Sequence, residues 1–295
     1  MRRFGEFLLA RNANAIVIAF LCALLPVFNF PTGFIAAIIV GLVTLQKGAK
    51  SGLYLLTWVA LPSIAELVLH RVGPFDVLVL RCIGVWFFAS LFNRYRAWNY
   101  LLEIVACVGV ILIFGLHFFI PNLQQWWMHE LTVFVKQTIT EAHWKFDAVT
   151  PALFATRLSP IATGLASFFF FLGLFIEVLV ARYWQTTLFE PGSFGKEFRR
   201  IRVGRIAALL MCVLVALVVL KVPAAFDALP LAMLPFFVAG LSLMHFWKNT
   251  QKFVLLLLML MYAGLFFLPA VAISIVAIVA FVDAWFNFRK NKMVL

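Results

Sequence analysis

RYWQTTLFEPGSFGKEFRRIRVGR, residues 182–205, decides the fold, because this densely basic stretch lies between two long apolar runs. Its six basic side chains are opposed by only two acidic ones, Glu190 and Glu197. Lys and Arg beside a membrane span resist translocation, so the stretch is predicted to be a cytoplasmic loop. That assignment sets the orientation of every other predicted span.

Pro191-Gly192 predicts a turn in the middle of this loop. The residues before the turn, among them Trp184 and Phe189, predict an amphipathic segment that lies at the lipid headgroups. The residues after it, 194–205, predict a basic helix that leads into the next span. Trp184 and four arginines are therefore candidate contacts to anionic lipid or to a partner protein: Arg199, Arg200, Arg202 and Arg205.

The composition indicates an integral membrane protein. Of its 295 residues, 65% are hydrophobic and only 12% are charged, and the mean hydropathy is +1.05. A soluble domain would carry about 25% charged residues. The net charge of +12 is explained by basic cytoplasmic loops facing anionic lipids, so no nucleic acid partner is expected. The four cysteines lie in apolar runs without CxxC spacing, which indicates neither a disulfide framework nor a metal site.

A membrane-spanning helix needs about 20 apolar residues. The breakers and charges predict an all-α, polytopic helix bundle in one transmembrane domain, 1–295. Ten spans are predicted, with eight or nine as alternatives because some are short: 13–30, 33–46, 52–69, 75–92, 100–120, 161–181, 206–221, 229–246, 253–268 and 270–288. Pro269 divides the last apolar run in two. With both termini cytoplasmic, all but six of the 24 Lys and Arg lie on that side.

Between Pro121 and Pro160 the hydropathy falls, and apolar residues recur at helical spacing. They are Trp127, Leu131, Val135, Ile139, Ala142 and Phe146. The pattern predicts an amphipathic helix over about 123–146 on the outer face of the membrane. Two interpretations remain open: the helix is a lid over an outward-facing cavity, or it only covers the bundle.

Ionisable residues inside spans are costly, which makes them candidates for function. The outer group contains the candidate substrate-binding residues, together with Arg71: Glu66, His70, Asp76, Arg81 and His117. Structural ion pairs are the alternative for this group. The inner group is Glu103, Glu177 and Asp283, which are predicted to pair with cytoplasmic arginines.

The first span carries small residues on one face, at Ala15, Ala19 and Ala23. Such a stripe lets another helix approach closely, either within the chain or from a partner protein. Internal packing is the favoured interpretation.

Nine residues of the central loop, in the pattern R-x-W-Q-x5-P-G-x-F-x2-E-F-x3-R, resemble the YybS-like membrane proteins, a bacterial family of unknown function. They are Arg182, Trp184, Gln185, Pro191, Gly192, Phe194, Glu197, Phe198 and Arg202. Relatives are expected to have Asn and Gly where this chain has Glu190 and Ser193. The family is distantly similar to the S-components of energy-coupling-factor transporters, although this chain has extra spans. The resemblance implies a bacterial inner-membrane location, a membrane partner at the alanine stripe and a solute site near the outer surface.

The sequence thus favours a membrane protein that binds or helps transport a small solute or a lipid-like molecule. The alternative is a structural or assembly protein that docks a cytosolic partner or anionic lipid through its basic loop. No HExxH, GxSxG, P-loop or dinucleotide-binding motif occurs, so an enzyme is not predicted, and no cofactor is implied.

Overall fold

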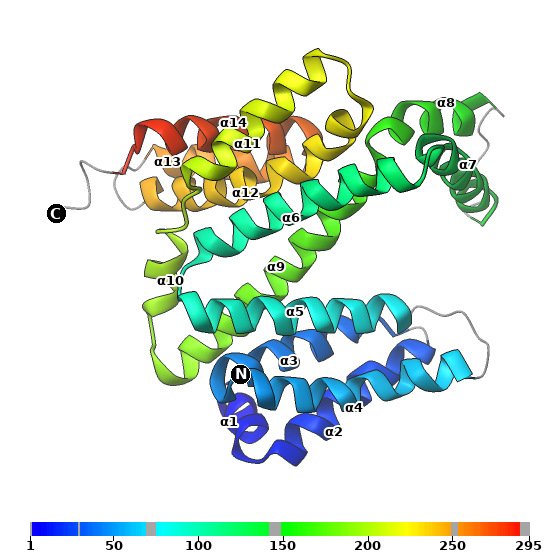
Figure 1. Cartoon of the computed structure of the whole chain (residues 1–295). Helices are drawn as coiled ribbons and strands as arrows, with labels where there is room; N and C mark the ends of the chain where they lie inside the picture. The colour runs from blue at the N-terminus through cyan, green and yellow to red at the C-terminus, as the bar shows by residue number, and fades with distance from the viewer. Residues whose placement is uncertain (1, 29, 69–74, 142–148, 249–252, 290–295) are drawn as a thin grey trace. The chain divides into compact units, whose positions relative to one another are not determined.

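The computed structural model describes residues 2–28, 30–68, 75–141, 149–248 and 253–289, and all regular elements within these ranges are helices (Figure 1). The α-helices are α1 (Arg2–Ala10), α2 (Asn12–Leu24), α3 (Gly33–Lys47), α4 (Ala49–Val68), α5 (Phe75–Tyr95), α6 (Trp98–Phe119), α7 (Leu123–Glu141), α8 (Val149–Leu158), α9 (Ala162–Phe189), α10 (Ser193–Phe198), α11 (Arg205–Val219), α12 (Pro223–Lys248), α13 (Val254–Phe267) and α14 (Pro269–Phe286). Two short 3-10 helices, η1 (Leu25–Phe28) and η2 (Ser159–Ile161), follow α2 and α8.

A helix occurs at each of the ten positions where a span was predicted, and the break at Pro269 falls between α13 and α14. Within the described ranges, five stretches are long and apolar enough to cross a membrane: Val77–Tyr95, Trp98–Phe119, Pro151–Phe189, Pro223–Trp247 and Pro269–Phe286. Together α1 and α2 would make a sixth, although the chain bends by 112° between them. The all-α, polytopic class is confirmed, and the number of helices that cross the membrane stays a prediction.

The helices group into two compact units. Unit 1 contains Met1–Leu101 and Phe171–Arg200, and unit 2 contains Leu102–Phe170 and Ile201–Leu295. Because the boundaries at residues 101 and 170 fall inside helices, α6 and α9 each contribute residues to both units. Each unit is described by itself below.

Unit 1 is built around α3, which packs against α2, α4 and α5. Almost every residue of α3 from Ala36 to Leu45 is buried. The last carbonyls of a helix have no partner within it, and an unsatisfied carbonyl costs several kcal/mol in lipid. Side chains from two other helices supply those partners here. The Leu45 carbonyl accepts from the Asn93 amide of α5 at 3.2 Å and from the Gln185 amide of α9 at 3.0 Å. Asn93 also donates to the Thr44 carbonyl at 2.8 Å, which accepts the Gly48 N–H as well.

The alanine stripe of the first span lies inside unit 1. Ala15, Ala19 and Ala23 are all buried, where α2 packs against α3 and α4. Their small side chains let the helices approach closely, as the internal-packing interpretation predicts. The stripe therefore offers no exposed surface to a partner protein in this structure.

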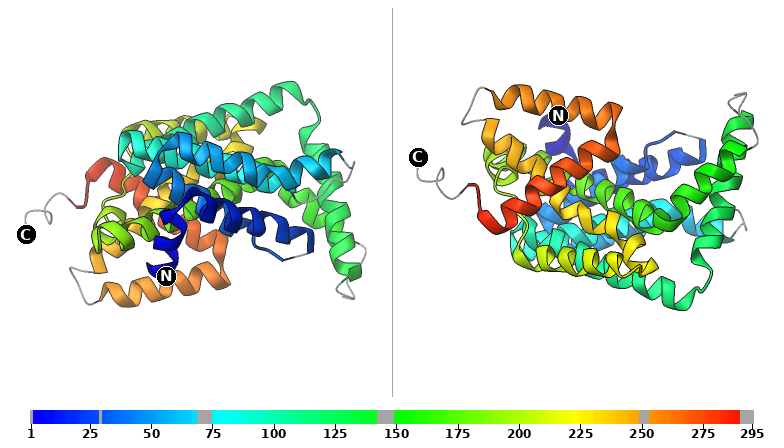
Figure 2. Two further views of the ribbon diagram at one scale, coloured as in Figure 1. Left: turned by 90° about the horizontal axis from the view of Figure 1, so that it is seen from below. Right: turned by 90° about the horizontal axis from the view of Figure 1, so that it is seen from above.

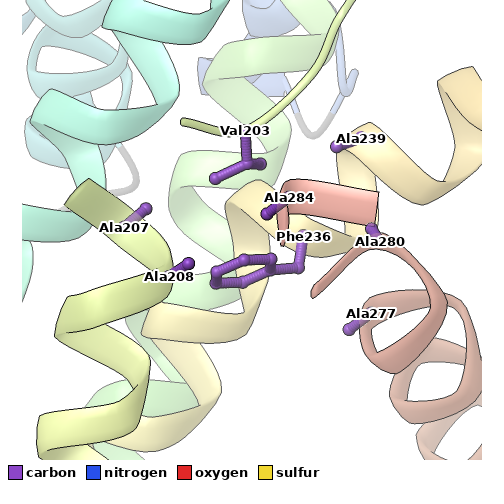
Figure 3. Close-up of a cluster of buried hydrophobic side chains, with 8 residues drawn as sticks. All are labelled: Val203, Ala207, Ala208, Phe236, Ala239, Ala277, Ala280 and Ala284. Atoms are coloured by element: carbon purple, nitrogen blue, oxygen red, sulfur yellow. The ribbon is translucent and has the colours of Figure 1, made fainter. Parts of the chain in front are cut away.

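Unit 2 is built around α12, which packs against α11, α13, α14 and η2. A cluster of mostly small side chains joins α11, α12 and α14 (Figure 3): Val203, Ala207, Ala208, Phe236, Ala239, Ala277, Ala280 and Ala284. Gly240 continues this close approach, because a Cβ atom there would lie 2.4 Å from the Val276 carbonyl oxygen. Small residues thus bring the helix backbones together, which is the usual basis of helix packing in membranes.

The end of α14 is fixed by Asp283. Its carboxylate accepts the Phe288 backbone N–H at 2.8 Å and forms ion pairs with Arg202 and Arg289, each at 3.8 Å. Arg289 is 1% exposed and donates to the Ile201 carbonyl at 2.9 Å. Burial lowers the pKa of Arg289 to about 10, and the neighbouring Asp283 opposes that shift. The predicted pairing of Asp283 with arginines is confirmed, and the cytoplasmic location of this end of α14 stays a prediction.

The basic loop differs from the prediction on both sides of its turn. Residues 182–189 are not a separate headgroup segment, because α9 continues through them to Phe189. The single helix predicted for 194–205 is also wrong, since α10 ends at Phe198 and α11 begins at Arg205. Between these two helices Ile201 and Val203 are buried. The Ile201 carbonyl accepts a hydrogen bond from the Arg289 side chain rather than from a backbone N–H of a helix.

The turn itself is confirmed. Gly192 has φ = 83°, a left-handed conformation that favours glycine, and the Ser193 N–H donates to the Glu190 carbonyl at 3.1 Å.

The predicted amphipathic helix is α7, which lies across one end of the other unit 2 helices (Figure 2). Of its predicted apolar stripe, Trp127, Leu131, Val135 and Ile139 are half-buried, whereas residues such as His129 and Lys136 on the opposite face are exposed. The helix packs against α8. Ala142 and Phe146, the last two members of the stripe, lie outside the described residues.

Candidate functional site

A buried acid, Asp227, organises the polar end of unit 2. It lies in the second turn of α12 and is 2% exposed. Its Oδ2 is 2.9 Å from His117 Nε2 of α6, and its Oδ1 accepts the Gly164 backbone N–H of α9 at 2.9 Å. An ionised carboxylate only accepts hydrogen bonds, so with Asp227 ionised it is Nε2 of His117 that donates. Three helices are thus joined through one side chain.

Gly164 permits this arrangement. A Cβ atom at this position would lie 1.7 Å from the backbone carbonyl oxygen of Asp227. Only glycine therefore lets α9 come close enough to α12 for its backbone N–H to reach the carboxylate.

A small cavity of about 30 Å³ lies beside the His117–Asp227 pair, and it is lined by residues that include Ser159, Gln124, Trp127 and Phe226. A cavity of this volume has room for one or two water molecules. Ser159 is 3% exposed, and its hydroxyl has no hydrogen-bond partner among the described residues. One wall of the cavity belongs to α7, whose Trp127 indole N–H donates to the Thr163 hydroxyl at 2.8 Å.

Two apolar grooves follow this polar cavity, each sharing lining residues with the space before it. The nearer one, of about 440 Å³, lies between α9, α12 and α14 and shares Phe226 with the cavity. The second, of about 540 Å³, lies between α11, α12 and α14. Leu229, Met233 and Ser274 line both grooves. The three spaces therefore form a series that is polar at one end and apolar over the rest of its length.

The walls of these grooves are chemically simple. The second groove is lined mainly by Met, Val, Leu, Ile and Phe side chains, and it borders the packed cluster of Figure 3 through Met211, Met233 and Phe281. The Ser274 hydroxyl is already bonded to the Ala270 carbonyl of its own helix at 2.8 Å. Volumes of 300–1,000 Å³ with apolar walls and a few polar groups are typical of sites for small molecules.

The predicted outer group is only partly described. Arg81 belongs to unit 1 and His117 to unit 2, and each has an acidic partner that the sequence analysis did not assign to it. Glu66 and Asp76 lie in α4 and α5, but their side chains are outside the described residues, as are His70 and Arg71.

The acid that pairs with Arg81 is Glu177 of α9, with Nε and Oε1 3.1 Å apart. Glu177 was predicted to pair with cytoplasmic arginines instead, and this prediction is wrong. The pair cancels two charges that would be costly inside a membrane. It also explains Gly173, because a Cβ atom there would lie 2.9 Å from Arg81 Nη2.

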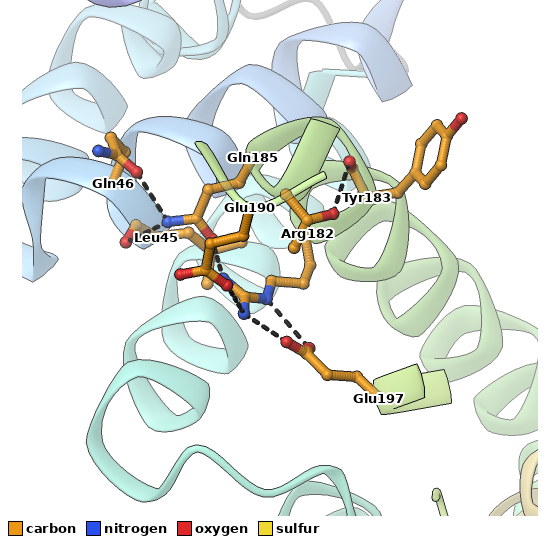
Figure 4. Close-up of polar contacts among 8 residues, drawn as sticks. Leu45, Gln46, Arg182, Tyr183, Gln185, Glu190 and Glu197 are labelled. Atoms are coloured by element: carbon orange, nitrogen blue, oxygen red, sulfur yellow. Dashed lines mark hydrogen bonds and ion pairs between the residues drawn. The ribbon is translucent and has the colours of Figure 1, made fainter. Parts of the chain in front are cut away.

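Arg182, the first base of the loop, is buried at the centre of a polar network in unit 1 (Figure 4). Its guanidinium holds the Glu197 carboxylate, with Nε and Oε2 3.1 Å apart, and it also pairs with Glu190 at 3.4 Å. It donates to the Gln185 side chain at 2.7 Å. The two acids of the loop therefore neutralise Arg182 within the protein.

The other predicted contacts in the loop are divided between the protein and its surface. The indole ring of Trp184 stacks on Phe4, with ring centroids 5.8 Å apart. Arg202 binds the end of α14, donating to the Asp283 carbonyl at 2.8 Å, and Arg199 is half-buried. Arg200 and Arg205 are exposed. Docking of anionic lipid or of a cytosolic partner through this loop stays a prediction, with fewer exposed bases than the sequence suggested.

Asp227 and Ser159 were missed by sequence reasoning. One signal was present, because Asp227 is the only acidic residue between Glu197 and Asp283. It was overlooked because the corresponding span was predicted to begin at residue 229, which placed Asp227 in a loop. Ser159 carries no comparable signal.

The chain was compared with protein-family models, with curated proteins and with solved structures, and none of them matches it. The resemblance of the central loop to the YybS-like family is therefore still a prediction. Among the described residues, no three His, Cys, Asp or Glu side chains are grouped so that they would hold a metal ion.

Proposed function

We propose that this multi-pass membrane protein binds a lipid-like molecule in unit 2, with its chain in the two apolar grooves and its polar end beside Asp227. The observation that carries the proposal is the succession of three neighbouring spaces that share lining residues. Phe226 links the polar cavity to the first groove, and Leu229, Met233 and Ser274 link the two grooves. A molecule with one polar end and a long apolar chain fits such a series.

Three physical arguments support a lipid-like ligand over a water-soluble solute. The grooves lie among α12 and α14, two helices long and apolar enough to cross a membrane. A polar solute would lose its hydration there without replacement hydrogen bonds. A hydrocarbon chain that is already in the bilayer has no hydration to lose when it enters the grooves. We also propose, from the distribution of Lys and Arg, that the protein resides in the bacterial inner membrane with both termini in the cytoplasm.

Photolabelling tests the proposal on the purified, full-length protein. Hexadecanol and palmitate that carry a diazirine near the middle of the chain should label groove residues such as Met211 and Met233, and excess unlabelled compound should compete. Leu229→Trp should lower this labelling at least fivefold, because Leu229 lines both grooves. Val213→Trp is the matched control, since Val213 is an exposed residue of α11 that lines neither groove.

Bulk lipid also touches the outside of the helices, so the decisive result is saturable labelling of the grooves. Labelling spread evenly over exposed helix surfaces, with no competition and no effect of Leu229→Trp, would refute lipid binding at this site.

A further inference from the structure

We infer that the polar end of this ligand is a single uncharged hydroxyl group, so that the ligand is a long-chain alcohol rather than a phospholipid, a fatty acid or an amine. The inference rests on the proposed function and adds the chemistry of the headgroup. Four features of the cavity beside Ser159, His117 and Asp227 support it: its size, its charge, its unpaired hydroxyl and its connection to the grooves.

The size of the cavity limits the headgroup. A volume of about 30 Å³ has room for one or two water-sized groups. A hydroxyl group fits that space. A phosphate has four oxygens around its phosphorus atom and a sugar has a whole ring, so either would displace the protein wall. Gly164 offers no room for adjustment, since its backbone is fixed against Asp227.

The charge of the lining excludes anions. Asp227 contributes a carboxylate, and no lysine or arginine is among the described residues that line the cavity. A fatty-acid carboxylate or a phosphate would therefore face a like charge in a region of low dielectric constant, where repulsion is strong. The nearest cationic candidate, His117, is already bonded to Asp227.

An ammonium group is also a poor match. It brings three N–H donors and no acceptor. Each oxygen of Asp227 already accepts one hydrogen bond from the protein, from Gly164 and from His117 respectively. The Ser159 hydroxyl and the remaining lone pairs of Asp227 could accept from it, but a charged group loses far more hydration than a hydroxyl when it enters a buried, mostly apolar site.

Ser159 identifies the complementary group. Its hydroxyl is buried, lines the cavity and has no partner among the described residues. A buried hydroxyl without a partner is costly, so a ligand that pairs with it gains affinity. A ligand hydroxyl both donates and accepts, and it can bond to Ser159 and to the remaining lone pairs of Asp227 together. The exposed side chain of Phe226 then directs the attached chain into the first groove.

A competition series with one chain length tests the inference. Unlabelled 1-hexadecanol, hexadecylamine, palmitate and hexadecyl phosphate are each titrated against the diazirine-bearing hexadecanol, with the protein in phosphatidylcholine nanodiscs. Hexadecanol should compete at a concentration at least tenfold lower than each of the other three compounds. Because this ranking is measured on the native chain, it does not depend on any variant that fails to fold.

Ser159→Ala and Ser274→Ala form the matched pair of variants. Ser159→Ala should lower the affinity for hexadecanol about tenfold and leave the affinity for palmitate unchanged, because only the alcohol bonds to the lost hydroxyl. Ser274→Ala should change neither of these affinities. Ser274 lines the grooves, but its hydroxyl is already bonded to the Ala270 carbonyl.

The outcomes separate the inference from the proposed function. Failure of every probe to label the grooves refutes the proposed function. Groove labelling with equal competition by all four compounds, with preference for a charged headgroup, or with no effect of Ser159→Ala refutes the alcohol and leaves lipid binding intact.

Discussion

Arg182 places the five N–H donors of its guanidinium in a buried position, where they need hydrogen-bond acceptors from the protein. Glu197 faces two of its nitrogens, Gln185 accepts from a third, and the ring of Phe92 lies 5.5 Å from the guanidinium carbon. Gln185 in turn donates to the end of α3. One arginine thus connects the turn after α9 to the central helix of unit 1.

Arg182→Met should destabilise the protein by about 3 kcal/mol, because it leaves the Glu197 carboxylate without its partner. The expected result is a lower midpoint of thermal unfolding in detergent. Arg182→Met combined with Glu197→Gln should recover part of the loss, since the unpaired charge is then removed. Arg200→Met, at an exposed base two residues beyond α10, is the control and should change little. Equal effects of Arg182→Met and Arg200→Met would show that the network contributes no stability.

Single residues also mark how far the sequence could be interpreted. The excess of bases in 182–205 marked a connection between two helical stretches, but it did not reveal that Arg182 and Arg202 bind within the chain. Their partners, Glu197 and Asp283, lie 15 and 81 residues away. Hydropathy has no information about such pairing, because the distance between two side chains depends on how the helices pack.

At the scale of whole helices, the contact between α9 and α12 depends on one glycine. Gly164 places the N–H of α9 against Asp227 at the polar end of the candidate site. Gly115 of α6 provides a natural comparison, because a Cβ atom there would meet nothing within 4 Å.

Gly164→Ala should force α9 and α12 apart and break the hydrogen bond to Asp227. The expected result is a loss of thermal stability together with loss of groove labelling by the hexadecanol probe. Gly115→Ala should be neutral or stabilising by up to about 1 kcal/mol, since alanine is the better helix former. A stable Gly164→Ala protein with normal labelling would mean that the close approach is not needed for the site.

Helices were the elements best predicted from the sequence. Apolar runs between charges located α3, α6 and α13 within a few residues, because the cost of a polar backbone in lipid forces such runs to be helical. The exact ends were harder to predict. The helix α9 continues past Arg182, whose guanidinium is hydrogen-bonded to Glu197 and Gln185. The periodicity of the sequence does not predict these bonds.

For the molecule as a whole, the distribution of Lys and Arg predicts the orientation in the membrane. Reporter fusions after Lys50, Arg96 and Arg200 should give a cytoplasmic signal, and fusions near Gly73 and Glu141 should give an external one. Paired alkaline phosphatase and fluorescent-protein reporters measure the two sides. A cytoplasmic signal at Glu141 would reverse the assignment and would place the polar cavity at the inner surface.

The interleaving of the two units has a consequence for biosynthesis. Unit 1 begins with the first residue of the chain but is complete only at Arg200, after 69 residues of unit 2 have been made. The Leu45 carbonyl has one partner, Asn93, 48 residues later, but its second partner, Gln185, follows only 140 residues later. At about 5–20 residues per second, this delay is roughly 7–28 s. During that interval the end of α3 has its bonds to α5 but not its bond to α9, so the ribosome finishes most of the chain before the first helices reach all of their final partners.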